Sequence, residues 1–226
     1  MNKKYLAFLF LLFFALIGFA QMPATWIEIG LSKKIVKDLK FEFNPEIRLL
    51  EDFKMDSYIL EGGLSYNAFK YLTVAGYYRF EEAWDYKKKS GAYKGKASYN
   101  RFAFDLKSGY EIFRFNIQGR IRYTRQLDEG SNATELRYRA KIDYNIKGIK
   151  LAPFISIELF NDKLVTAEDK SLISGGLKDI DKIRYTGGLS YGINKNNEVS
   201  LFYRLQDNRI KDESTNILGL SISHDF

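Results

Sequence analysis

Polar and apolar residues alternate strictly along the stretch from residue 39 to residue 49. Apolar side chains, Pro45 among them, occupy the odd-numbered positions, and polar side chains occupy the even-numbered ones. Successive side chains of a β-strand point to opposite faces, so this pattern predicts a strand with one dry face and one wet, charged face. The same two-residue period returns over 115–123 and 136–144. The chain is therefore predicted to consist almost wholly of such strands.

Eleven stretches are predicted to be strands, and no stretch has a sustained helical period. Many exceed the roughly five or six residues of soluble sheets and approach the length that crosses a bilayer at a tilt. Short and long connections alternate, as in bacterial outer-membrane barrels. The fold class predicted is all-β, an antiparallel up-and-down transmembrane β-barrel of about 10–12 strands, with an even number expected because both termini are normally periplasmic. The predicted strands cover 25–33, 39–49, 58–67, 71–81, 98–111, 114–126, 134–145, 149–161, 182–192, 197–206 and 215–226.

The first twenty residues have the character of a secretion signal. A short basic region precedes an apolar run over 5–17, and Gly18 and Ala20 supply the small residues that a signal peptidase prefers. The sequence predicts a cleaved signal peptide over 1–20 and a single outer-membrane barrel domain over 21–226. An uncleaved helical anchor is the alternative, but the run is short for a membrane span.

Composition narrows the classes of function. The chain has no cysteine, which excludes disulfides, thiolate metal sites and a lipoprotein anchor. Its net charge of +7 is a mild excess, and an exported protein rarely meets nucleic acid, so we expect no nucleic-acid partner. No run of 18 apolar residues follows the first twenty residues, so helical spans are not expected.

Alternation alone does not say whether the apolar face contacts lipid or a protein core. Tyrosines recur on that face six residues apart, as at Tyr138 and Tyr144, a spacing that fits the edges of an apolar band about 25 Å tall. The final strand, ending in Phe226, resembles the C-terminal signal that the barrel-assembly machinery recognises, although His224 departs from that pattern. We therefore expect membrane lipids and the assembly machinery as partners, in the outer membrane of a Gram-negative bacterium.

One hairpin motif occurs twice. Gly62-Gly63-Leu64-Ser65-Tyr66 recurs as Gly187-Gly188-Leu189-Ser190-Tyr191, and Tyr77-Tyr78-Arg79 recurs at the same offset as Phe202-Tyr203-Arg204. Duplication and a shared hairpin geometry both explain the repeat.

Four short motifs along the chain carry a wider resemblance: Trp26, Pro45-Glu46-Ile47-Arg48, Gly63-Leu64-Ser65-Tyr66 and Tyr77-Tyr78-Arg79. In these motifs the chain resembles an uncharacterised barrel family, domain of unknown function 2490. That family has no established activity, so the resemblance implies a fold and a location only.

Enzymatic chemistry finds little support in the sequence. The single histidine, His224, has the parity of the lipid-facing side, so a histidine-based hydrolase or acyltransferase is not expected. Acidic residues are plentiful, but no pair is singled out for a carboxylate-based hydrolase. Metal-ligand spacings and nucleotide-binding fingerprints are absent. We predict no enzyme activity and no catalytic, cofactor-binding or metal-binding residue.

The wet face carries the more informative pattern. Strands between 98 and 145 are mostly basic, whereas those between 39 and 81 hold most of the acidic residues. The residues predicted to line the lumen are Arg48, Arg79, Arg101, Arg120, Arg122, Arg137, Arg139, Lys141, Arg184, Arg204, Glu42, Glu46, Glu61 and Glu158.

Two interpretations of these charges stay open. Charges inside a small barrel either pair as a salt-bridged plug or line a narrow pore, with a basic wall facing an acidic one, that favours anions or zwitterions. The predicted function is accordingly passive, a small-solute channel with a preference for anions or a structural barrel. The alternative is a soluble exported β-barrel that binds an apolar ligand.

Overall fold

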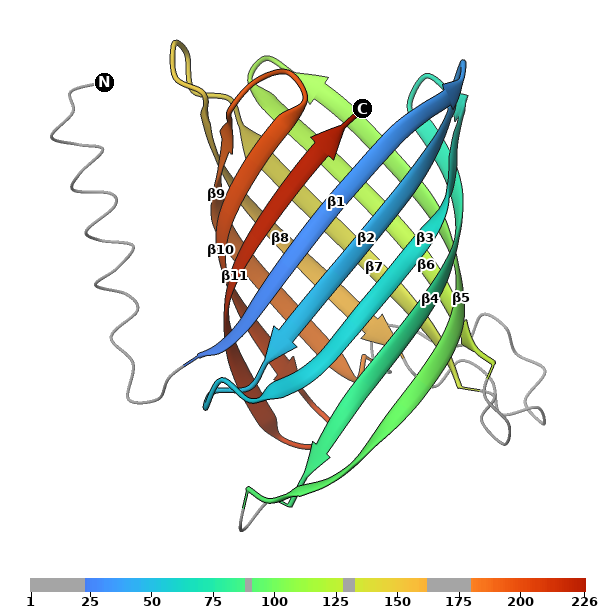
Figure 1. The fold of residues 1–226 in the computed structure, drawn as a ribbon. Helices are drawn as coiled ribbons and strands as arrows, with labels where there is room; N and C mark the ends of the chain where they lie inside the picture. The colour runs from blue at the N-terminus through green and yellow to red at the C-terminus, as the bar shows by residue number, and fades with distance from the viewer. Residues whose placement is uncertain (1–22, 88–90, 128–132, 162–179) are drawn as a thin grey trace, which may run out of the picture.

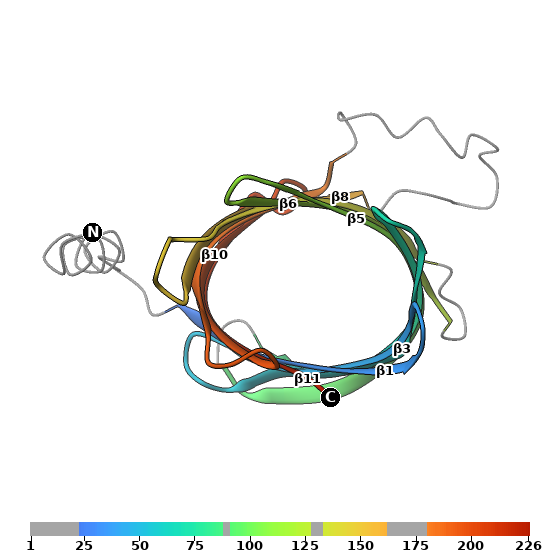
Figure 2. The same cartoon turned by 90° about the horizontal axis from the view of Figure 1, so that it is seen from above.

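The computed structural model describes residues 23–87, 91–127, 133–161 and 180–226. They form eleven β-strands that close into one barrel (Figure 1; Figure 2). No helix among the described residues has the length and hydropathy needed to cross a membrane. The strands are β1 (Ala24–Val36), β2 (Leu39–Leu49), β3 (Met55–Phe69), β4 (Leu72–Tyr86), β5 (Tyr93–Ile112), β6 (Phe115–Gln126), β7 (Thr134–Tyr144), β8 (Leu151–Asn161), β9 (Lys182–Gly192), β10 (Asn197–Asn208) and β11 (Glu213–Asp225).

The barrel has up-and-down topology with a parallel seam. Each strand pairs antiparallel with its neighbour in the chain, and β1 pairs in parallel with β11, from Ala24 opposite Ile217 to Ser32 opposite Asp225. The predicted all-β up-and-down barrel is confirmed. The expectation of an even strand number is wrong, because the parallel pairing of β1 with β11 closes a barrel of eleven strands.

The two ends of the barrel differ in their connections. Turns of two to six residues follow β1, β3, β5, β7 and β9, and we call this the short-turn end. Connections of four to twenty residues follow the even-numbered strands, at the long-loop end. Because the strand number is odd, β1 starts at the long-loop end whereas Phe226 lies at the short-turn end (Figure 1). The predicted signal peptide, residues 1–20, lies outside the described residues.

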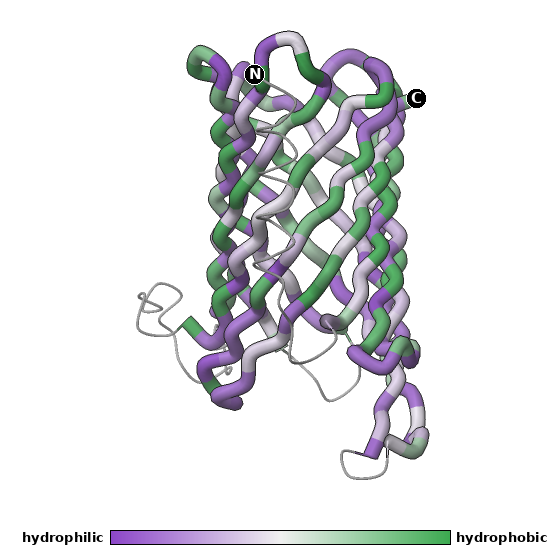
Figure 3. Tube along the Cα trace, turned by 90° about the vertical axis from the view of Figure 1, so that its left-hand side faces the viewer, coloured by the Kyte–Doolittle hydropathy of each residue, from purple (hydrophilic) through white to green (hydrophobic). Residues whose placement is uncertain are grey.

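The outward face of the barrel is apolar, as the alternation predicts. Along β5, Phe102 and Phe104 are 45% and 61% exposed, whereas the intervening Ala103 and the following Asp105 are 2% and 1% exposed. The hydropathy colouring in Figure 3 shows this alternation along strand after strand. The barrel thus exposes its apolar side chains and turns its charged ones inward, the reverse of a soluble barrel.

Three aromatic rings inside the barrel, those of Tyr77, Phe154 and Phe202, lie against glycines of neighbouring strands. The ring of Tyr77 covers Gly63, and that of Phe154 covers Gly188 so closely that an added Cβ would lie 2.6 Å from its Cζ. Gly63 and Gly188 are the second glycines of the two copies of the repeated hairpin motif. In both copies the absence of a side chain at this glycine leaves room for the aromatic ring.

Candidate functional site: a charged lumen

Three cavities follow one another through the barrel. A central cavity of about 290 Å³ is lined by residues from all eleven strands. It shares Lys107, Arg120 and Arg139 with a cavity of about 460 Å³ at the short-turn end. It shares four arginines with a cavity of about 330 Å³ at the long-loop end. We call these the central, short-turn and long-loop cavities.

All fourteen residues predicted to line the lumen line one of these cavities. Twelve line the central cavity, Arg101 lines the long-loop cavity and Lys141 lines the short-turn cavity. Whether they act on a passing solute stays a prediction. Our prediction omitted the lining residues Trp26, Glu28 and Glu135, although Trp26 and Glu28 share one parity in β1.

The middle of the lumen contains a fully paired cluster of charges. Arg122 on β6 donates from Nε to Asp105 at 2.6 Å and from Nη1 to Glu61 on β3 at 2.9 Å. Glu61 also accepts from Nη2 of Arg79 at 2.8 Å. The side chains of Arg122, Glu61 and Asp105 are only 5%, 6% and 0% exposed. Two arginines and two carboxylates therefore neutralise one another and tie β6 to β3, β4 and β5.

A second ion-paired group joins the other side of the barrel. Glu158 on β8 accepts from Arg120 at 2.6 Å and from Arg184 at 3.1 Å. Two guanidinium groups share this one buried carboxylate, so the group has an excess of positive charge.

An aromatic ring helps to hold three guanidinium groups inside the barrel, one of them that of Arg184. Trp26 on β1 is 7% exposed, and the Cζ atoms of Arg48, Arg184 and Arg204 lie 4.1, 5.1 and 4.8 Å from its ring centroid. Arg204 also donates to Glu28 at 3.1 Å. Cation–π attraction offsets part of the cost of gathering like charges in one place.

The basic wall predicted from the sequence lies on β6 and β7. Their register sets Arg120 opposite Arg139 and Arg122 opposite Arg137 on the inward face. Like charges directly opposite each other on neighbouring strands are destabilising, so this wall requires counterions. The carboxylate of Glu61, which comes from β3, supplies one of them.

Comparison with known proteins adds a family but no activity. The family described as protein of unknown function, DUF2490, matches residues 24–216. The chain belongs to that family. A search of the curated proteins found no match. Membership in DUF2490 thus agrees with the resemblance noted from the sequence motifs and assigns no substrate.

The described part of this DUF2490 barrel contains no group of three or more His, Cys, Asp or Glu side chains placed to hold a metal ion. Its histidine, His224, forms a hydrogen bond through Nδ1 with Asn197 at 2.8 Å and packs edge-on against Phe226. The imidazole therefore has an amide and an aromatic ring as neighbours at the short-turn end.

Proposed function

We propose that this barrel spans the outer membrane of a Gram-negative bacterium and that its lumen is a narrow passage preferring small anions. The membrane location is supported by the apolar outward face, where large side chains such as Phe104, Leu106 and Ile155 are 49–65% exposed. Such a surface is stable against lipid and prone to aggregation in water. In the usual orientation the short-turn end faces the periplasm, where Phe226 is accessible to the assembly machinery.

One observation carries the anion preference. Together, the three adjoining cavities are lined by thirteen Lys and Arg side chains and by seven Glu side chains. A lumen with such an excess of cations concentrates anions and repels small cations. The charged lining also works against the alternative of a soluble barrel with an apolar ligand in its interior, because an apolar ligand gains nothing by displacing water from charged groups.

A structural barrel is the second candidate, and the paired cluster around Arg122 favours it. Cross-barrel ion pairs of this kind occupy the middle of the lumen and resist displacement, because separating them leaves buried charges without partners. The two candidates differ in whether ions pass the cluster.

Single-channel conductance separates them. The mature protein is inserted in a planar bilayer under a potassium chloride gradient, and the reversal potential gives the ion preference. We expect a small, steady conductance with chloride preferred. Arg139→Glu is expected to shift the reversal potential toward cation preference, whereas Arg114→Glu, in an exposed turn at the same end, leaves it unchanged. A folded barrel without conductance contradicts the passage and supports the structural role, and a monomer soluble without detergent contradicts the membrane location.

A further inference from the structure

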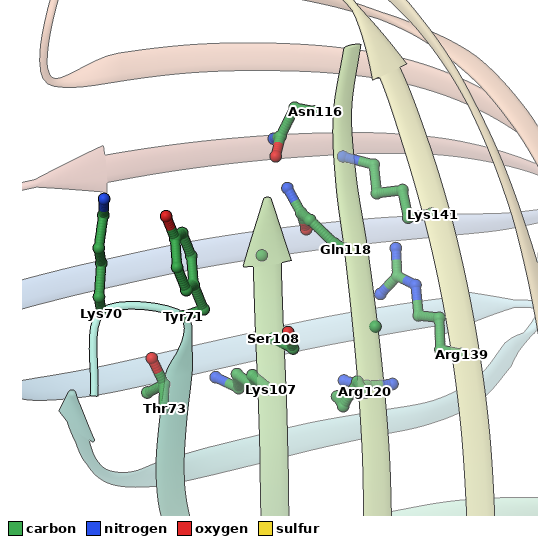
Figure 4. A pocket seen from close by; sticks show the side chains of 12 residues that line it. Lys70, Tyr71, Thr73, Lys107, Ser108, Asn116, Gln118, Arg120, Arg139 and Lys141 are labelled. Atoms are coloured by element: carbon green, nitrogen blue, oxygen red, sulfur yellow. The ribbon is translucent and has the colours of Figure 1, made fainter. Parts of the chain in front are cut away.

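The short-turn cavity is lined by cations without any carboxylate. Five of its twelve lining residues are Lys or Arg, and none is Asp or Glu. Figure 4 shows Arg139 and Lys141 on β7 beside Gln118 on β6, with Arg120 and Lys107 deeper in the cavity. Its volume of about 460 Å³ falls within the range of small-molecule sites, about 300–1,000 Å³.

Three of these five cations form ion pairs with carboxylates that do not line the cavity. Lys107 pairs with Glu42 at 3.1 Å, Arg120 with Glu158 at 2.6 Å and Lys141 with Asp143 at 2.6 Å. Arg139 and Lys70, in contrast, have no ion pair with another described residue.

Arg139 also stands directly opposite another guanidinium, that of Arg120. Arg120 has a donor to spare as well, because its Nε is buried and has no hydrogen-bond partner among the described residues. The carboxylate beside this pair, Glu158, lies opposite Arg139 on β8 and accepts from Arg120 and Arg184, so one carboxylate is surrounded by three guanidinium groups. A buried donor without a partner is costly, and an anion at this place removes that cost.

We propose that the short-turn cavity binds a phosphate group between Arg139 and Arg120, with Lys70 contributing positive charge from the β3–β4 turn. Phosphate is compact, carries up to two negative charges near neutral pH and presents several acceptor oxygens, which matches two guanidinium forks better than a single carboxylate does. The cavity has room beyond one phosphate, so the ligand is inorganic phosphate or a small phosphomonoester. The site needs no continuous path through the barrel and goes beyond the proposed passage.

Equilibrium binding to the folded mature barrel in zwitterionic detergent tests this site. Inorganic phosphate and glycerol 3-phosphate are titrated separately at constant ionic strength, with chloride as the balancing anion. Arg139→Gln is expected to weaken binding about tenfold or more, since it removes charge-assisted hydrogen bonds. The matched control Arg114→Gln removes the same charge from an exposed turn at the same end and is expected to change affinity less than about twofold. Tighter binding of glycerol 3-phosphate identifies a phosphomonoester site, and equal or tighter binding of phosphate identifies a site for the free ion.

Several results overturn the proposal. They are unchanged affinity in Arg139→Gln, an equal loss in Arg114→Gln, or no phosphate binding above that of chloride. Heat-modified mobility in gels checks that each variant is folded. Should Arg139→Gln not fold, Arg139→Lys keeps the charge but loses the fork, and wild-type affinity in that variant contradicts the assignment. Phosphate binding by a barrel that conducts no ions refutes the passage alone, and conduction without phosphate binding refutes this site alone.

Discussion

The two ends of the lumen have similar numbers of cations but different compensation. Six Lys and Arg residues line the long-loop cavity, together with Glu81 and Glu135. Each of the six has an ion pair, as in the contact between Arg101 and Glu81 at 2.9 Å. The short-turn cavity has five cations and no carboxylate in its lining, and Arg139 has no ion pair among the described residues.

This difference shows that the number of arginines does not mark a binding site. An arginine such as Arg122, held by two buried carboxylates, contributes to the fold, and its donors are occupied. Arg139 lies on the strand next to it, faces the same lumen and has its donors available. A guanidinium group that forms no ion pair is therefore the feature that separates a ligand site from a structural ion pair.

The largest expected effect is the loss of stability when the paired cluster around Arg122 is broken. Arg122→Met leaves Asp105 buried and without its partner, so we expect a loss of about 3–5 kcal/mol in the free energy of unfolding. Arg139→Met removes a like charge opposite Arg120 and an opposite charge beside Glu158, which keeps its ion pairs with Arg120 and Arg184, so we expect a change within about 1 kcal/mol. Urea unfolding of the two variants in the same lipid vesicles, followed by tyrosine and tryptophan fluorescence, measures both. Equal losses in the two variants contradict the distinction.

The next largest effect is expected on phosphate affinity, when a carboxylate is introduced into the lining of the short-turn cavity. Gln118 lies opposite Lys141 in the cavity, so Gln118→Glu places a negative charge beside the proposed phosphate. We expect phosphate affinity to fall about tenfold, the consequence of roughly 1.4 kcal/mol of repulsion.

The matched control for this variant is Gln126→Glu, on the same strand and the same face but in the long-loop cavity. It adds the same charge at the other end of the lumen, beyond the reach of a phosphate at Arg139 in physiological salt. Phosphate affinity is expected to stay at the wild-type value. An equal fall in both variants assigns the effect to the net charge of the barrel and contradicts a local site.

The strands were predictable wherever one face of the sheet is apolar. The predicted 39–49 matches β2, whereas β5 begins at Tyr93 rather than at the predicted residue 98. In that extension β4 and β5 form a ribbon at the long-loop end (Figure 1), where Lys94 pairs with Asp85. Neither face of such a ribbon requires apolar residues, so the alternation that identifies the other strands is missing there.

The sequence predicts which charged side chains point into the lumen, but it does not predict which of them form ion pairs with one another. Alternation places Arg120, Arg122 and Arg139 inward, because side-chain direction is local. Which arginine meets a carboxylate depends on how the barrel closes, since Glu61 reaches Arg122 from three strands away. The local pattern predicts eleven strands, but the closure, with β1 parallel to β11, departs from the usual even strand number and is not expressed in any local pattern.

The smallest expected effect is a rise in phosphate affinity when a carboxylate is removed from the long-loop cavity, which then resembles the short-turn cavity more closely. Glu135→Gln removes the carboxylate that pairs with Arg137 and lies 4.0 Å from Lys182. In an Arg139→Gln background, where the short-turn site is weakened, we expect this change to raise the residual phosphate affinity about two- to fivefold, because such a pair is worth up to about 1 kcal/mol. Glu51→Gln, an exposed position at the same end, is the matched control and should leave that affinity unchanged. An equal rise with Glu51→Gln would attribute the gain to net charge, whereas a rise with Glu135→Gln alone shows that freeing a lumenal arginine suffices to create a weak anion site.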